Sequence, residues 1–139
     1  MNITQLEQDI TKILEALDKA KHDPQFALQC ANSLSTLMFN LSPMCVTAQE
    51  DANRADRAYK DLLDSELIRM RGEGDKTVAE SEAIARRKGK ALFEEYLIKQ
   101  SMAQKLKMLR EDIDRRISLL QSWASELRSQ KVFRGSLSQ

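Results

Sequence analysis

The chain has 139 residues, of which 42% are hydrophobic and 31% charged, with 4 Gly, 2 Pro and a formal net charge of +1. Gly and Pro are too few for a turn-rich β protein, and apolar residues are too many for a disordered chain. Aromatic residues make up only 5%, so the core must be aliphatic, as is usual in helical bundles and coiled coils. We therefore expect a single all-α domain.

Apolar residues with alternating spacings of three and four predict a first helix over residues 3–20. They are Ile3, Leu6, Ile10, Ile13 and Leu17. Asp23 followed by Pro24 is a typical start for the next helix, because Asp caps and Pro fits the first turn. An apolar face then predicts a helix over residues 24–41. We expect Pro43 to break or kink the chain after it, since proline disfavours helical geometry at Ser42.

A third helix is predicted over residues 45–71, where alanines recur at helical spacing and allow close approach of another helix. Two glycines within residues 72–75 predict a turn. Thr77 and Glu80 then form a capping-box pattern, after which helical periodicity continues to about residue 131 with Gly89 as its weak point. The expected organisation is an N-terminal helical pair (1–43), a long hairpin around the turn (44–131) and a frayed tail (132–139).

The long C-terminal helix carries a sustained apolar seam, and the other helices look too short to cover it. We therefore expect exposed apolar surface and a coiled-coil-like homo-oligomer. The expected interface residues are Leu106, Leu109, Ile113, Ile117, Leu120, Trp123 and Leu127.

Groups that carry catalysis or bind metals are scarce. The chain has one histidine, His22, placed in a predicted turn, and two isolated cysteines, Cys30 and Cys45, which we interpret as reduced thiols. We therefore expect no enzyme activity, no metal and no cofactor. Neither a secretory signal nor an apolar run of membrane-spanning length is present, which favours a cytoplasmic protein with no membrane partner.

Charge is unevenly distributed along the chain. Residues 1–85 hold 9 Lys/Arg and 15 Asp/Glu, a balance of −6, whereas residues 86–139 hold 13 and 6, a balance of +7. Two interpretations stay open: the basic half binds phosphates, or acidic and basic helices pair with each other. The candidate nucleic-acid contacts are Lys60, Arg69, Arg71, Arg86, Arg87, Lys88 and Lys90.

The segments Tyr59–Leu63, Arg69–Asp75, Thr77–Glu80 and Leu119–Ser125 give residues 45–131 a layout that resembles the UvsY-like recombination mediators of phages and prophages. The resemblance implies a ring-like oligomer in a bacterial host cell that binds single-stranded DNA. It also implies partners: a strand-exchange recombinase, which the mediator loads, and a single-strand-binding protein. In that family, the DNA contacts come from basic residues around the segment before the glycine turn, which here offers Lys60, Arg69 and Arg71. This chain departs from the pattern, because Asp61, Asp64 and Glu66 make the segment acidic overall. The departure partly favours Arg86, Arg87, Lys88 and Lys90 as DNA contacts.

A protein-only function is the alternative. The pI of about 7.7 and the few aromatic residues favour a helical adaptor, a chaperone or a small inhibitor that binds no nucleic acid.

Overall fold

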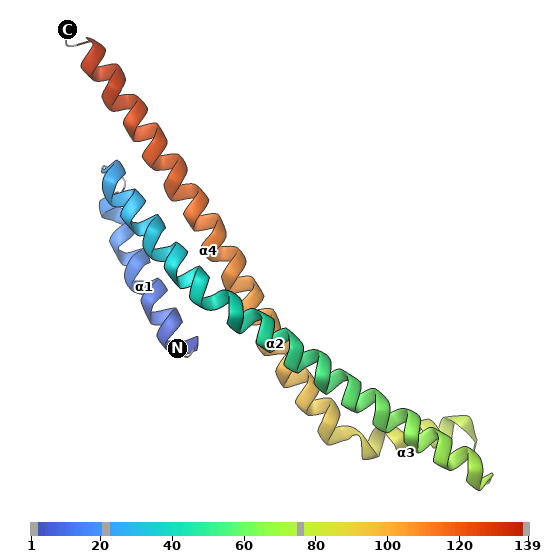
Figure 1. The fold of residues 1–139 in the computed structure, drawn as a ribbon. Helices are drawn as coiled ribbons and strands as arrows, with labels where there is room; N and C mark the ends of the chain where they lie inside the picture. Colours follow the sequence, from blue (N-terminus) through green and yellow to red (C-terminus); the bar gives the residue numbers. More distant parts are fainter. Residues whose placement is uncertain (1–2, 21–22, 75–76, 138–139) are drawn as a thin grey trace. The chain divides into compact units, whose positions relative to one another are not determined.

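A computed structural model describes the backbone of residues 3–20, 23–74 and 77–137, with side chains for 3–16, 23–74 and 77–135. Over these residues the chain forms four helices and no strand: α1 (Ile3–Ala20), α2 (Pro24–Glu73), α3 (Val78–Lys88) and α4 (Lys90–Leu137) (Figure 1). The all-α prediction, with a long C-terminal helix, is confirmed. The expected roles of the Leu17 and His22 side chains lie outside the described residues.

The chain divides into two compact units. Unit 1 comprises residues 1–43 and 108–139, and unit 2 comprises residues 44–107. Helices α2 and α4 each contribute to both units, because the division falls inside them.

Helix α2 continues through Pro43, so the predicted break at Ser42–Pro43 is wrong. The alternating spacing of inward-facing residues runs on unchanged from Leu41 to Cys45 and Ala48, and burial of that face favours one continuous helix. Pro43 is exposed, and the carbonyl that lacks its usual partner belongs to Phe39, which is also exposed. Water can therefore donate to that carbonyl, which limits the cost of the missing bond.

The helix predicted over residues 77–131 is divided at Gly89. Its start is as expected, since the Glu80 amide donates to Thr77 Oγ1 at 3.2 Å and the Thr77 amide donates to Glu80 Oε2 at 3.4 Å. At Gly89 the amide donates to the Ala85 carbonyl, and the Phe93 amide donates to the Gly89 carbonyl, both at 2.9 Å. Helical hydrogen bonding therefore passes through the interruption. At the other end, α4 runs to Leu137, so residues 132–137, expected beyond the helix, belong to it.

Three helical segments form the core of unit 1, and Figure 1 shows α1 lying beside the first part of α2. Each contributes fully or nearly fully buried apolar side chains, including Leu6 from α1, Leu34 from α2 and Ile113 from α4. The apolar faces predicted for residues 3–20 and 24–41 thus meet the second half of α4. This packing explains how the short helix α1 is stabilised.

Unit 2 has a different interior, because it pairs α2 with α3 and the start of α4 mainly through small residues. The buried positions include Ala48 and Ala52 on α2, Ala85 on α3, and Gly89 and Ala103 beyond it. Small side chains let helix backbones approach closely but bury little apolar area. Met70 and Leu106 are the large side chains buried in unit 2, whereas others, such as Leu97 and Ile98, remain exposed.

Candidate nucleic-acid interface

Three aromatic rings cluster in unit 2. The ring centroids of Tyr59 on α2 and Phe93 on α4 are 5.1 Å apart, and those of Phe93 and Tyr96 are 6.3 Å apart. Gly89 makes room for this cluster, because a Cβ added there would lie 2.9 Å from Tyr59 Cε2. The rings do not bury one another completely, since Phe93 keeps 40% of its surface exposed.

Two cations lie on the same helical face as Phe93. Because helical hydrogen bonding passes through Gly89, Arg86 lies one turn before Lys90, and Lys90 lies about one turn before Phe93. Arg86 and Lys90 are exposed, and neither forms an ion pair within the described part of the chain. An exposed aromatic ring and two cations that have no ion-pair partner among the described residues thus occupy consecutive turns.

Lys60 on α2 lies close to the same cluster. Its ammonium donates to Asp56 Oδ2 at 2.8 Å. This hydrogen bond and the Asp56 charge raise the pKa of Lys60, and Tyr96 adds to the rise. Lys60 therefore stays charged, with part of its charge compensated. We call Lys60, Arg86, Lys90 and Phe93 the aromatic–basic surface.

The other candidate cations are placed differently. Arg69 and Lys88 both bind Glu66, with nitrogen–oxygen distances of 2.9 and 3.0 Å, and Arg69 also reaches Glu73 at 2.9 Å. Hydrogen bonds from Arg69 and Lys88 lower the pKa of Glu66. The pairing of acidic and basic helices expected as one interpretation therefore occurs here, between α2 and α3.

Arg71 and Arg87 belong to neither group. Arg71 lines a small hollow of about 210 Å³ with Met70 and Val78, near the Gly74 turn, and Arg87 is exposed on α3. The seven predicted cations thus do not form one strip. Lys60 lies next to the aromatic cluster, and Arg86 and Lys90 share the helical face of Phe93. Arg69 and Lys88 instead pair with Glu66.

Phe93 is not among the nucleic-acid contacts predicted from the sequence, all of which are cations. A signal was present in the spacing, since Phe93 follows Lys90 by three residues and Arg86 by seven. That spacing shows a shared face only if the helix continues through Gly89, which the sequence left open.

Most of the predicted oligomer interface is covered within the chain. Leu106, Ile113, Ile117 and Leu120 are buried, and Leu109, Trp123 and Leu127 are half-buried. The premise that one chain leaves this seam exposed is therefore wrong. The large apolar side chains that do reach the surface of α4 lie elsewhere, and in unit 2 they are Phe93, Leu97, Ile98 and Met102.

No group of three or more potential metal ligands occurs within the described ranges. None of the helices, over the residues described, is long and apolar enough to cross a membrane. Comparison of the chain with protein-family models, curated proteins and solved structures gives no match.

Proposed function

We propose that this protein binds single-stranded nucleic acid through the aromatic–basic surface. One observation carries the proposal: the half-exposed ring of Phe93 lies within two turns of two exposed cations that have no ion-pair partner among the described residues. Lysine and arginine bind phosphates by neutralising their charge and releasing counterions. An exposed aromatic ring offers a platform on which an unpaired base stacks.

The geometry favours a single strand over a duplex, because a base can reach a side-chain ring only when it is unstacked. Stacking does not distinguish one base from another, so we expect little sequence preference. The affinity of one chain should be low, since three cations and one ring offer few contacts.

Assembly would compensate for that low affinity, because linked copies raise apparent affinity without new contacts. We propose that copies associate through apolar residues exposed on α4, with Leu97, Ile98 and Met102 as the candidates in unit 2. The resemblance to UvsY-like mediators extends this proposal. In it, an oligomer in the bacterial cytoplasm helps load a strand-exchange recombinase onto DNA coated by a single-strand-binding protein.

The test is fluorescence anisotropy with labelled oligo-dT across a range of salt concentrations. Replacing Arg86 and Lys90 by Ala should weaken binding about tenfold and reduce the salt slope by roughly 1.4, from about 0.7 per phosphate contact. Phe93→Leu should weaken binding about fivefold or more while leaving the slope unchanged, because stacking involves no counterion.

The matched control replaces Lys107 and Arg110 by Ala, which removes the same charge from exposed positions further along α4. Equal losses in the two double variants would show that only net charge matters and would contradict a defined site. Circular dichroism should show unchanged helicity throughout, because Ala is an excellent helix former.

A protein-binding adaptor is the second candidate, and the exposed apolar side chains of Leu97, Ile98 and Met102 favour it. If the wild-type protein fails to bind oligo-dT at tens of micromolar in low salt, the nucleic-acid proposal is wrong and the adaptor becomes the better account.

A further inference from the structure

A groove in unit 1 lies between the start of α2 and the last turns of α4. Its volume is about 560 Å³, and its apolar lining comes from Leu28, Ala124, Val132 and Phe133. It belongs to unit 1, whereas the aromatic–basic surface belongs to unit 2.

The groove exists because the C-terminal end of α4 extends beyond the N-terminal end of α2. Figure 1 shows α4 extending past the start of α2, and α2 begins only at Pro24. Ala124 still packs into the core, whereas Val132 and Phe133, two turns later, keep 70% and 65% of their surface exposed. Two large apolar side chains therefore project beside a hollow that no described part of the chain fills.

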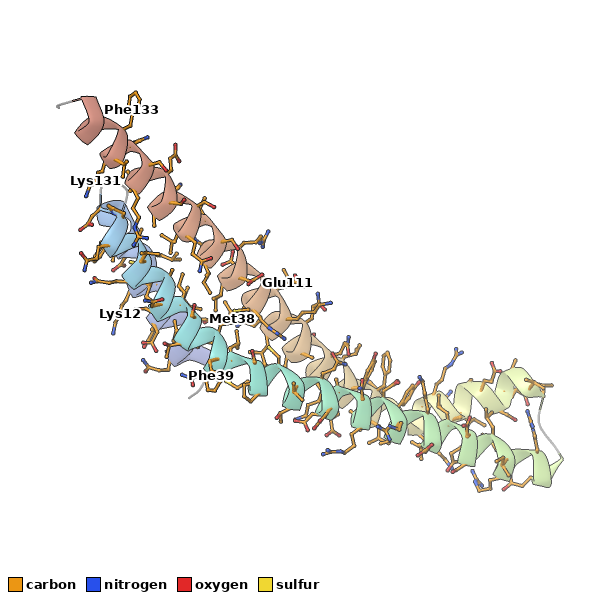
Figure 2. All side chains as sticks on the ribbon, turned by 45° about the horizontal axis from the view of Figure 1, so that its top comes forward. Lys12, Met38, Phe39, Glu111, Lys131 and Phe133 are labelled. Atoms are coloured by element: carbon orange, nitrogen blue, oxygen red, sulfur yellow. The ribbon has the colours of Figure 1, made fainter. Side chains whose placement is uncertain are left out.

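The edge of this groove is basic. Arg128 lines it, and Arg128 and Lys131 both line a second hollow of about 510 Å³ that shares Leu28. Figure 2 shows Lys131 and Phe133 near the end of α4. Among the described residues, Asp23 is the only acidic group lining either hollow. Its carboxylate accepts a hydrogen bond from the Gln25 amide at 3.0 Å. Over the described residues, the edge thus combines two cations with one carboxylate that is already engaged.

We propose that this groove binds an acidic peptide segment of a partner protein, with a bulky apolar side chain of that segment in the hollow. Apolar lining selects the apolar side chain, because its transfer from water is the main source of affinity. Arg128 and Lys131 select flanking carboxylates, because complementary charge at a rim steers and specifies a partner. The volume of the groove is sufficient for one aromatic or leucine side chain with adjacent backbone.

The probe is a fluorescein-labelled peptide of four aspartates followed by leucine and phenylalanine, titrated with the full-length protein in an anisotropy assay. We expect saturable binding with a Kd on the order of tens of micromolar, as is usual for a contact of this size. Two control peptides separate the contributions: one has asparagines in place of the aspartates, and the other ends in two serines. Each should bind at least about tenfold more weakly.

The protein variants are chosen at exposed positions, so folding should be retained. Arg128→Glu and Phe133→Ser should each weaken binding of the peptide about tenfold or more. Arg115→Glu is the matched control, because it reverses an exposed charge on α4 within the same unit, about 20 Å earlier along the helix. It should leave the affinity for the peptide within about twofold.

Any of the following results would overturn the proposal. The first concerns the peptide itself: no saturable binding up to about 1 mM, or equal effects of Arg128→Glu and Arg115→Glu. The second is a dimer in sedimentation experiments that Phe133→Ser converts to monomer, since a second copy would then cover the groove. The third is displacement of the peptide by oligo-dT, which would make the edge a general anion site.

Discussion

Gly89 lies directly against the ring of Tyr59, so that a Cβ at Gly89 would be 2.9 Å from Cε2 and 3.2 Å from Cδ2. Real Cβ contacts are essentially never shorter than 3.0 Å, and the Tyr59 ring packs beside Phe93 at a centroid distance of 5.1 Å. This close approach connects the break between α3 and α4 to the aromatic cluster, and it gives the first prediction.

Gly89→Ala should destabilise the protein by about 1–2 kcal/mol. Alanine would gain roughly 0.5–1 kcal/mol in helix propensity, but overpacking against the Tyr59 ring should cost more, typically 1–3 kcal/mol. Urea unfolding followed by circular dichroism measures the difference. A more stable variant would show that the ring moves aside at little cost.

Gly72 and Gly74 provide matched comparisons, because a Cβ at either position would meet no atom within 4 Å. Gly72 lies within α2, so Gly72→Ala should stabilise the protein by about 0.5–1 kcal/mol. Gly74 has a φ of 74°, so Gly74→Ala should destabilise by about 1–2 kcal/mol, the cost of a left-handed conformation for an L-residue. The two stability changes should have opposite signs in the same urea assay. Changes of the same sign would show that backbone conformation does not determine the effect of alanine at these positions.

Pro43→Ala should stabilise the protein by about 2 kcal/mol. An internal proline costs a helix about 3 kcal/mol. The gain in stability is smaller by about 0.4–1 kcal/mol, because alanine raises the conformational entropy of the unfolded chain. Thermal and urea unfolding should both report the increase. Unchanged stability would indicate that α2 is adjusted around Pro43 so that alanine cannot restore the missing bond.

Glu66 should make stability depend on pH in the acid range. Arg69 and Lys88 lower the pKa of Glu66 in the folded state from the ordinary value of 4.5. The contribution of Glu66 to folding stability is therefore fully present above about pH 4.5 and is lost as pH falls through the lower, folded-state pKa. The stability difference between the wild type and Glu66→Gln should therefore shrink as pH falls below 4.5. Urea unfolding at several pH values measures it, and a constant difference would mean that the ion pairs contribute nothing.

Charge substitutions at neighbouring positions of α4 should have opposite outcomes. Leu120 is 1% exposed and Leu119 is 50% exposed, so Leu120→Lys should unfold unit 1, whereas Leu119→Lys should change stability by less than about 0.5 kcal/mol. Circular dichroism and light scattering distinguish loss of folding from loss of assembly. A folded Leu120→Lys variant with a lower mass would instead support the seam as an interface between copies.

Much of the local structure follows from the sequence alone. The alternating spacings of three and four predict the helices and the residues on their inner faces, such as Leu34 and Ile113, because periodicity is a property of one helix by itself. The capping pattern of Thr77 and Glu80 and the turn around Gly74 are equally local, since each depends on hydrogen bonds or dihedral angles of a few adjacent residues.

Only the tertiary structure decided what covers each face. Pro43 remains in a helix because the apolar seam on both sides of it packs against other segments, and this packing outweighs local propensity. The seam from Leu106 to Leu120 is buried by the chain itself, which periodicity cannot show, because a pattern identifies a face and not its neighbour. Likewise, Phe93 is exposed and Lys88 is paired with Glu66 because of how α2 meets α3 and α4, and these contacts join residues far apart in the sequence.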